Sequence, residues 1–392
     1  MRFHSAISDD ESSEDAAERV IGECRDAMGY RVDLVFAFFT THHRDNAQEV
    51  LERVWLELDP QTVVGCSAEG VIGGDREIER EPGLAVLAAS VPDVRVHPFH
   101  VAGRSDWRQI LSDEEELKDR LGLGPQTRAV ILFGDPFTTP LDPLLLAADA
   151  AAPGVPVVGG MASSGRQPGQ NLLLRNDEAF DQGVVGVSLG GPIAVDTVVS
   201  QGCRPIGRPL VITRARENIV EQLGGKPAME MLRETVMDLP EEQKELLQNG
   251  LLIGRAISEY RERFGRGDFL VRNLVGVEEQ SGAIALADYV KTGQTVQFHV
   301  RDAQTADEDL ALLLEAQKLA EAPAGGLLFS CNGRGTRLFP EPCHDIRATR
   351  AALPKTSVAG FFAAGELGPV GGKNFVHGHT ASLALFRPGR GA

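Results

Sequence analysis

The sequence predicts a mixed α/β fold with two related mixed-sheet domains, built from repeated βαβ-like units with helices on the sheet faces. Three observations support this prediction. The chain has 392 residues, which is too long for one ordinary core. Three short apolar segments share one spacing, and each follows another apolar run by about 30 residues. Hydrophobic residues make up 42% and charged residues 24% of the chain, as in ordinary globular proteins.

The repeated segments share Val, then Gly two residues later, then Ala five residues after the Val. They are VVGCSAEG (63–70), VVGGMASSG (157–165) and VAGFFAAGE (358–366). The apolar runs that precede them are DLVFAFFT (33–40), RAVILFG (128–134) and GGLLFSC (325–331). Because the upstream runs keep step with the shared motif, we predict three copies of one supersecondary unit, two in the N-terminal half and one in the C-terminal half.

A helix is expected between the members of each pair. In the first copy Ala47, Leu51, Val54 and Leu58 lie on one face at helical spacing. A strand, a helix and a second strand of this length form the crossover that joins two parallel strands. The two strands of each copy are therefore predicted to be parallel neighbours in a sheet.

Further elements follow along the chain. Segments 183–191 and 192–200 are expected to be consecutive strands, and 295–302 alternates apolar and polar residues as a half-exposed strand does. The helix after it is expected to open with a capping box from Thr305 to Glu308. GVSLG (186–190) fits the nucleophile-elbow pattern, but Pro and another strand-like run follow it, so Ser188 is interpreted as a strand residue.

The domain boundaries are placed by composition. Residues 205–218 combine proline, glycine and charge between the two halves. The expected division is an acidic N-terminal segment (1–29), a first α/β domain (30–215) and a second α/β domain (216–392).

The charge and hydropathy of the chain exclude several classes of function. The formal net charge is −17, from 39 basic and 56 acidic side chains, which disfavours nucleic acid and anionic lipid as partners. Apolar runs are shorter than the roughly 18 residues that a membrane span needs. The N-terminus lacks the apolar region of a secretory signal. We therefore expect a cytoplasmic protein with no nucleic-acid partner and no membrane partner.

No metal and no cofactor is predicted. The five cysteines are widely spaced without a CxxC motif, which favours reduced thiols over a disulfide framework or a close-pair zinc site. GPVGGKN (368–374) lacks the first glycine and the hydroxyl residue of a phosphate loop, and no GxGxxG motif is present. His377 and His379 would share one face of a strand, but a hydrogen-bonding or packing role is favoured over metal binding.

The segment FSCNGRG (329–335) is compatible with three chemistries. Cys331 could be a nucleophile if a histidine activated it. Arg334 could bind a carboxylate in bidentate fashion, assisted by backbone amides of the glycine-rich turn. Alternatively, the glycines permit a turn with positive φ, and Cys331 is a small packed residue.

Parallel strands would bring candidate binding residues to one edge of the sheet, since their carboxyl ends meet there and α/β folds tend to bind ligands at that edge. The residues expected to gather there are Cys66, Ser67, Glu69, Ser163, Ser164, Cys331, Asn332, Arg334 and Glu366. Asn332 and Arg334 are preferred as ligand-facing groups, and Cys331 is interpreted as a packed thiol.

Three strings resemble the FIST proteins, a family named for F-box proteins and intracellular signal transduction. They are VAGFFAAGELGPVGGKNFVHGHTASLALF (358–386), FSCNGRGTRLF (329–339) and VVGCSAEGVIGG (63–74). The resemblance implies a FIST N-like domain followed by a FIST C-like domain. It also implies a cytoplasmic sensory module that binds a small molecule, with amino acids among the candidates, and acts through a signalling protein partner. Asn374 and His377 lie in the same C-terminal string and join the ligand-binding candidates.

The leading hypothesis is a small-ligand-binding sensory protein without catalysis. In it Arg334 binds the carboxylate of an amino acid and Glu366 binds the ammonium group. A structural ion pair between the same two residues is the alternative. A second hypothesis is an enzyme with Cys331 as nucleophile and His377 as base, for acyl transfer or hydrolysis. A third is a protein-interaction scaffold.

Overall fold

The computed structural model describes residues 1–29, 31–260, 264–265 and 267–389, and the chain forms two compact units. Unit 1 comprises Met1–Val199, Leu310–Val376 and Thr380–Ala392, and unit 2 comprises Ser200–Asp309 and His377–His379. The mixed α/β class with two-domain organisation is confirmed. The division differs from the expected boundary, because the chain leaves unit 1 at residue 199 and returns to it at residue 310.

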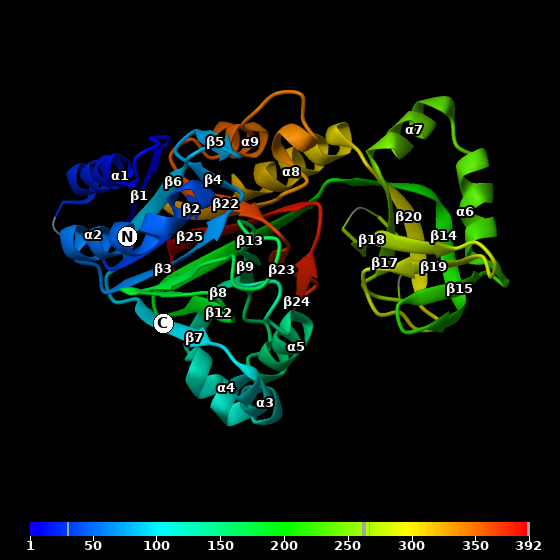
Figure 1. Cartoon of the computed structure of the whole chain (residues 1–392), viewed down its shortest axis with the longest axis horizontal. Helices are drawn as coiled ribbons and strands as arrows, with labels where there is room; N and C mark the ends of the chain where they lie inside the picture. The colour runs from blue at the N-terminus through cyan, green and yellow to red at the C-terminus, as the bar shows by residue number, and fades with distance from the viewer. Residues whose placement is uncertain (30, 261–263, 266, 390–392) are drawn as a thin grey trace. The chain divides into compact units, whose positions relative to one another are not determined.

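Unit 1 contains three six-stranded sheets (Figure 1). Sheet I has the order β1 (Arg2–Ser8), β6 (Leu84–Ser90), β2 (Leu34–Thr40), β3 (Thr62–Ala68), β10 (Leu173–Arg175), β11 (Glu178–Phe180). Sheet II has the order β24 (Lys373–His377), β23 (Glu366–Val370), β9 (Val157–Met161), β8 (Thr127–Gly134), β12 (Val184–Gly190), β7 (Arg95–Val101). Sheet III has the order β13 (Ile193–Gln201), β25 (Thr380–Pro388), β21 (Gly325–Cys331), β22 (Ser357–Ala363), β4 (Gly70–Gly73), β5 (Arg76–Glu79).

The three predicted repeats form the centres of these sheets. The pairs β2/β3, β8/β9 and β21/β22 are each parallel. The helices that connect them are α2 (Ala47–Leu58), α5 (Leu141–Ala151) and α9 (His344–Ala352). The strand–helix–strand prediction is thus confirmed for all three copies. All three lie in unit 1, whereas the sequence suggested that they would be shared between two domains.

The glycine shared by the repeats has one structural role in each copy. A Cβ atom on Gly65, Gly159 or Gly360 would lie 1.7, 1.9 or 1.7 Å from a carbonyl oxygen of the neighbouring parallel strand. Because real Cβ atoms do not approach an oxygen so closely, only glycine allows this strand contact. The glycine recurs in the sequence because two parallel strands approach each other closely in each copy.

The three sheets exchange strands with one another. After β3 the chain continues into β4, which pairs with β22 of sheet III. After β9 it continues to β10, which pairs with β3 of sheet I, and after β22 it continues to β23, which pairs with β9 of sheet II. The turns that follow the second strand of each repeat therefore lie where two sheets meet.

An aromatic cluster fills the core between the sheets. Phe38 lies 5.3 Å from Phe133 and 5.0 Å from Phe361, and Phe329 lies 5.5 Å from Phe361, measured between ring centroids. These rings come from all three sheets, and each is fully buried. Aromatic pairs of this geometry add to the stabilisation from burial alone.

The N-terminal residues belong to unit 1. Strand β1 lies beside β6 and pairs with it antiparallel (Figure 1). Helix α1 (Ser13–Met28) buries Val20 and Ile21. Ser12 caps this helix by accepting a hydrogen bond from the Asp15 N–H. The segment expected to be an acidic extension is therefore a strand and a helix with an apolar buried face. The other helices of unit 1 are α3 (Arg104–Ser112) and α4 (Glu114–Leu121), with short 3₁₀ turns η1 (Thr41–Asn46) and η3 (Gly335–Arg337).

Unit 2 is a small antiparallel barrel. Its strands are β14 (Cys203–Arg216), β20 (Thr295–Arg301), β17 (Leu251–Ala256), β18 (Phe269–Glu278), β19 (Ala283–Leu286), β15 (Ile219–Leu223) and β16 (Lys226–Pro227). Since β14 pairs with both β20 and β15, the sheet closes on itself. Its helical elements are α6 (Ala228–Met237), α7 (Glu241–Leu246) and η2 (Leu247–Asn249).

Two local predictions in this region require correction. The stretch 205–218, expected to separate the domains, lies mostly within β14. Helix α8 (Ala303–Gln317) begins earlier than expected, with Asp302 rather than Thr305 at its start. The Asp302 carboxylate accepts hydrogen bonds from the Gln304 N–H at 3.3 Å and from the Thr305 hydroxyl at 2.5 Å, so the acidic side chain takes the capping role.

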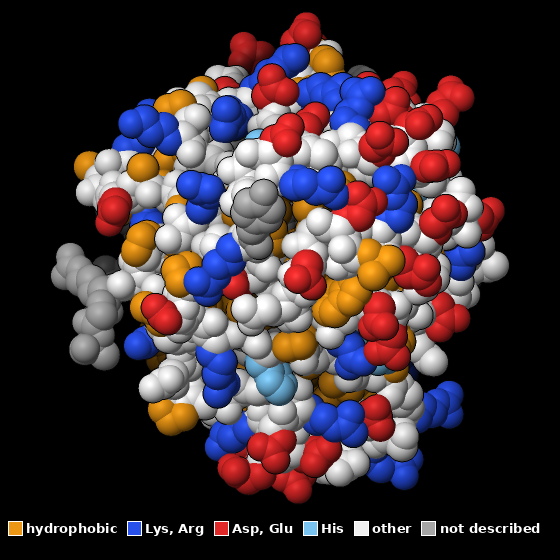
Figure 2. Space-filling model, turned by 90° about the vertical axis from the view of Figure 1, so that its left-hand side faces the viewer, with side chains coloured by type: hydrophobic (Ala, Val, Ile, Leu, Met, Phe, Trp, Pro, Cys, Tyr) orange, Lys and Arg blue, Asp and Glu red, His pale blue; other side chains and the backbone are white. Residues whose placement is uncertain are grey.

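The surface carries both signs of charge. Figure 2 shows acidic and basic side chains interspersed over one face, rather than gathered in a single basic block. None of the helices within the described residues combines the length and apolar character needed to cross a membrane.

Candidate functional site

The turn after β21 is tightly folded. The Arg334 N–H donates to the Cys331 carbonyl oxygen at 2.7 Å, and the Gly333 N–H lies 3.4 Å from the Cys331 sulfur. The Asn332 N–H donates to the carbonyl oxygen of Ala363 at 2.9 Å, which ties the turn to the end of β22. Gly335 has φ of +54°, and a Cβ there would lie 2.5 Å from a Glu79 carboxylate oxygen. The positive φ favours glycine at position 335.

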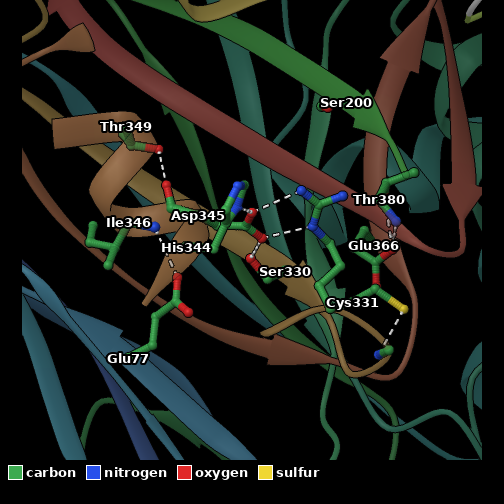
Figure 3. Close-up of polar contacts among 12 residues, drawn as sticks. Glu77, Ser200, Ser330, Cys331, His344, Asp345, Ile346, Thr349, Glu366 and Thr380 are labelled. Atoms are coloured by element: carbon green, nitrogen blue, oxygen red, sulfur yellow. Dashed lines mark hydrogen bonds and ion pairs between the residues drawn. The ribbon is translucent and has the colours of Figure 1, made fainter. Parts of the chain in front are cut away.

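Arg334 forms a buried ion pair with Asp345 of α9. Arg334 Nε lies 2.7 Å from Asp345 Oδ2, Arg334 Nη2 lies 2.8 Å from Oδ1, and both side chains are at most 1% exposed. The Ser330 hydroxyl donates to the same carboxylate at 2.7 Å (Figure 3). Burial alone would raise the pKa of Asp345, but the charge and hydrogen bonds of Arg334 hold it well below its usual range. The pair anchors the start of α9 to the turn.

Glu366 is also fully buried, at the start of β23. The backbone N–H and the hydroxyl of Thr380 donate to Glu366 Oε2 at 3.2 and 2.7 Å (Figure 3). Burial raises the pKa of Glu366 to about 8, although the bonds from Thr380, the Cys331 thiol and the Arg334 charge oppose the rise. Its Oε1 atom has no hydrogen-bond partner among the residues that the structure describes, and the same holds for Nη1 of Arg334.

A third buried carboxyl group, Glu77, lies beside α9. It accepts a hydrogen bond from the Ile346 N–H at 2.9 Å (Figure 3). Burial and the nearby charge of Asp345 raise the pKa of Glu77 to about 8. Near neutral pH, Asp345 is therefore the ionised partner of Arg334, and Glu77 and Glu366 are mainly protonated. This distribution follows because one buried guanidinium cannot compensate three buried carboxylates.

A small cavity opens beside the turn. Its volume is about 10 Å³, which is room for about one water molecule, and it is lined by Glu69, Gly70, Glu79, Arg80, Asn332, Arg337 and Phe362. Arg337 forms a bidentate ion pair with Glu69, in which Nη1 lies 3.0 Å from Oε2, and the two side chains are 40% and 28% exposed. Two guanidinium groups and two carboxylates thus surround one space.

Thr336 holds two of the charged residues that line the cavity, Glu79 and Arg80. Its N–H and hydroxyl donate to the Glu79 carboxylate, the N–H at 2.9 Å. The guanidinium of Arg80 donates to the Thr336 hydroxyl at 2.8 Å. Asn332 Oδ1 is buried and has no hydrogen-bond partner within the described part of the chain. The cavity therefore combines positioned charges with an available acceptor.

Three serines join the strand ends next to the cavity. The hydroxyls of Ser67 and Ser164 are 2.6 Å apart, and the Ser163 hydroxyl donates to the carbonyl oxygen of Phe362 at 2.5 Å. Ser163 also accepts a hydrogen bond from the Glu69 N–H at 2.9 Å. These contacts link the ends of β3, β9 and β22, as expected if the carboxyl ends of the repeats share an edge. The serine hydroxyls are engaged within the protein.

The other predicted site residues do not line this cavity. Cys66 is fully buried in β3, and burial raises the pKa of its thiol well above the usual value. Asn374 is at the opposite end of β9, where its Oδ1 accepts from the Val157 N–H at 2.7 Å and its Nδ2 donates to Asp149 at 2.6 Å. His377 is buried and belongs to unit 2, whereas Cys331 belongs to unit 1.

His379 lies in unit 2 as well, and its Nε2 is 3.0 Å from Asn273 Oδ1. Among the residues that the structure describes, no group of three histidine, cysteine, aspartate or glutamate side chains has an arrangement that could hold a metal ion.

Sequence reasoning placed Glu69 and Asn332 at the cavity but missed the other charged residues there. Arg337 lies in the FSCNGRGTRLF string, and its position three residues after Arg334 was the available signal. Glu79 and Arg80 carry no motif, because they reach the site through the pairing of β5 with β4. Asp345 was also missed, and its place in the first turn of α9 gave no indication of a buried ion pair.

Comparison with known proteins finds two domain models in sequence, whose boundary near residue 227 differs from the division into compact units. The model of the FIST N domain matches residues 33–226, and that of the FIST C domain matches residues 228–369. An uncharacterized protein of Mycobacterium tuberculosis (strain ATCC 25618 / H37Rv) is 39% identical over 390 residues, which cover 98% of this chain and 100% of the relative. An uncharacterized protein of Mycobacterium bovis (strain ATCC BAA-935 / AF2122/97) is 38% identical over 389 residues, covering 98% and 99%.

FIST domains are associated with signal transduction and with the sensing of small ligands. Both domain models match in order, and together they cover most of the sequence. The chain therefore belongs to the FIST family.

Proposed function

We propose that this protein is a cytoplasmic sensory protein that binds an amino acid at the charged residues beside the β21 turn and passes the signal to a protein partner. The small cavity there would open to admit the ligand when Arg337 separates from Glu69. The proposal depends most on one observation, which is that two guanidinium groups and two carboxylates line one space. An amino acid has one charge of each sign, and a site that binds it needs one partner for each. The Arg337–Glu69 ion pair provides one group of each sign, so each can bind the opposite charge of the ligand.

The exchange of partners explains how a ligand can enter. The guanidinium of Arg337 is planar and holds a carboxylate in bidentate fashion, so the ligand carboxylate can take the place of Glu69. Glu69 is then free to bind the ligand ammonium group together with the buried acceptor Oδ1 of Asn332. The ring of Phe362 offers an apolar surface for the ligand side chain.

In this proposal the residues that bind the ligand carboxylate and the ligand ammonium group are not Arg334 and Glu366, which the sequence suggested. Arg334 already holds Asp345 and does not line the cavity, so its guanidinium supports the turn. Arg337 is more exposed and its partner is easier to replace. The carboxylate-binding role is therefore proposed for Arg337 and the ammonium-binding role for Glu69, with Glu79 beside it.

Ligand exchange at Glu69 suggests a route for the signal. Glu69 lies between β3 of sheet I and β4, which pairs with β22 of sheet III. Arg337 lies in η3, between β21 and α9. A ligand that separates the two side chains would change the contact between these elements, and a protein partner that binds this surface would detect the change.

Equilibrium binding tests the proposal. The full chain is titrated calorimetrically with a panel of amino acids, and each ligand that binds is compared with its carboxyl methyl ester and its N-acetyl derivative. We expect binding to be lost with either derivative, because each removes one charge. Arg337→Ala should weaken binding by about tenfold or more, since a charged hydrogen-bonded pair is lost. Arg347→Ala, at an exposed position of α9, serves as the matched control.

Two results would overturn the proposal. One is the absence of binding for every amino acid at millimolar concentration. The other is an affinity for the amino acid that is the same in the wild type, Arg337→Ala and Arg347→Ala proteins.

A further inference from the structure

Cys331 differs from the other cysteines of the chain in its accessibility. Cys24, Cys66, Cys203 and Cys343 are buried, whereas Cys331 is partly exposed at the end of β21. A partly accessible thiol next to cationic groups is the usual setting of a reactive cysteine. Accessibility alone does not define a site, and the groups around the sulfur provide the further evidence.

Two fully buried polar groups next to Cys331 each have an atom without a partner. Nη1 of Arg334 and Oε1 of Glu366 have no hydrogen-bond partner in the described part of the chain, and both residues are 0% exposed. Buried polar groups in native proteins are almost always satisfied, so two such atoms together indicate a group that is missing from the site.

Contacts place both groups at the Cys331 side chain. The thiol is hydrogen-bonded to the Glu366 carboxyl group, and the charges of Arg334 and Cys331 interact. The labelled side chains of Cys331 and Glu366 lie side by side in Figure 3. On the turn, the Gly333 N–H points to the sulfur at 3.4 Å. The Gly333 N–H contacts the sulfur, and Arg334 and a protonated Glu366 interact with the same side chain, so these three groups are candidate donors to an anion formed there.

We propose that Cys331 is a redox-modification site, at which a hydroperoxide oxidises the thiol to a sulfinate held by Gly333, Arg334 and Glu366. The inference goes beyond ligand sensing and does not depend on it. It explains why donor capacity is left unused in a buried position: the acceptor oxygens are formed in place by the reaction.

The oxidation balances with the hydroperoxide as the only co-reactant. In the first step the sulfur attacks the O–O bond and takes one oxygen, the thiol becomes a sulfenic acid, and the hydroperoxide leaves as an alcohol or as water. The sulfur loses two electrons and the peroxide gains them. A second hydroperoxide repeats the step and gives sulfinic acid, which ionises to the sulfinate. Glu366 gives its carboxyl proton to the departing oxygen and takes up the thiol proton, so it is protonated again for the second step, and the proton of the sulfinic acid leaves to solvent.

Oxidation would also affect the ligand cavity. Asn332 follows Cys331 directly and lines that cavity, and Arg337 lies in the same loop. Two oxygen atoms added at the sulfur would occupy space at the base of the turn. The loop would then respond to two inputs, a bound ligand and an oxidant.

The test uses the full chain and hydrogen peroxide. Peptide mapping by mass spectrometry follows the gain of oxygen at each cysteine, and the four buried cysteines are internal controls. We expect Cys331 to gain two oxygens, at a rate at least about tenfold above that of N-acetylcysteine under the same conditions, because a partly exposed sulfur beside a guanidinium and an N–H donor is the setting of a reactive cysteine. Glu366→Gln keeps the shape but cannot supply a proton, and should slow the reaction about fivefold or more.

The wild-type measurement stands without any variant. An oxidation rate at Cys331 no higher than that of N-acetylcysteine would overturn the proposal, as would oxidation that stops at the sulfenic acid. For a folded Glu366→Gln protein, checked by circular dichroism, an unchanged rate would also overturn the role given to Glu366. A Cys331→Ser protein that still gains oxygen at the same peptide would contradict the assignment of the site.

Discussion

Arg334 and Arg337 lie three residues apart in one loop, and each forms a bidentate ion pair with a carboxylate. They differ in their surroundings. The Arg334–Asp345 pair is at most 1% exposed, whereas the side chains of Arg337 and Glu69 are 40% and 28% exposed. The first pair connects the turn to α9 in the interior, and the second lies at the wall of a cavity.

The difference in exposure decides what each pair can do. Breaking a buried pair leaves an uncompensated charge in a medium of low dielectric constant, which costs about 3–5 kcal/mol. An exposed pair contributes only about 0–1 kcal/mol, because water and salt screen it. A ligand can therefore replace Glu69 on Arg337 at small cost, and nothing comparable holds for Asp345 on Arg334. The same chemical pair serves as structure in one place and is suited to recognition in the other.

The largest expected effect comes from breaking the buried pair. Asp345→Ala should lower the free energy of unfolding by about 3–5 kcal/mol, because the Arg334 charge stays buried without its partner. Urea denaturation measures the change. Glu69→Ala removes the corresponding carboxylate of the exposed pair and should cost less than about 1 kcal/mol. Equal losses in the two variants would show that the comparison is wrong.

The next effect is a dependence of stability on pH near the buried pair. Burial raises the pKa of Glu366 and Glu77 to about 8, from a usual value of 4.5. Between these values the folded state binds more protons than the unfolded state. The contribution of each carboxyl group to the free energy of unfolding is therefore fully present below about pH 4.5, and it is lost as the pH rises toward 8. Each carboxyl group contributes a slope of up to about 1.4 kcal/mol per pH unit.

Glu366→Gln tests this dependence, because the amide does not titrate. The free energy of unfolding of the variant should fall less steeply between pH 5.5 and 8, conditions chosen inside the window of about 4.5 to 8. The exposed residue Glu341, changed to glutamine, is the control and should leave the slope as it is. A slope that is the same in all three proteins would mean that Glu366 does not titrate in this window.

The smallest effect on stability is expected at Arg337. Arg337→Ala should change the free energy of unfolding by less than about 1 kcal/mol. This difference should shrink further when the salt concentration is raised to about 1 M, where exposed charges are screened within roughly 3 Å. Urea denaturation at low and high salt checks both statements. A loss of several kcal/mol that persists in high salt would place Arg337 with Arg334 as a structural residue.

Much of the fold could be predicted from the sequence, because its signals are local. The Val–Gly–Ala spacing marks the second strand of each repeat, since Gly65, Gly159 and Gly360 must let two backbones approach closely. The apolar runs mark the first strands. The meeting of strand ends at one edge follows from parallel pairing, and Glu69 and Asn332 do lie at one cavity.

The division into units could not be predicted in the same way. It depends on the pairing of β22 with β4 and of β9 with β23, which joins residues nearly 300 and more than 200 positions apart. Composition at 205–218 suggested a boundary, but a strand can contain proline and glycine where its register shifts, as β14 does between Ile206 and Leu210.

The roles of the two arginines were also beyond the sequence. Arg334 can be buried because Asp345, in the first turn of α9, pairs with it. The position of Asp345 depends on how α9 packs against the sheet. Arg337 binds Glu69, which precedes β4 and is far from the turn in sequence. Both arginines lie in one short motif, and residue type alone does not distinguish them.

Amino-acid binding by Arg337→Lys tests the central claim most directly. Lysine keeps the positive charge but loses the planar fork that binds a carboxylate with two hydrogen bonds. Isothermal titration calorimetry should give an affinity for the amino acid that is lower by about tenfold or more, and urea denaturation of the same protein should give a free energy of unfolding within about 0.5 kcal/mol of the wild type. Unchanged affinity, or a loss of stability as large as that of Asp345→Ala, would contradict the account.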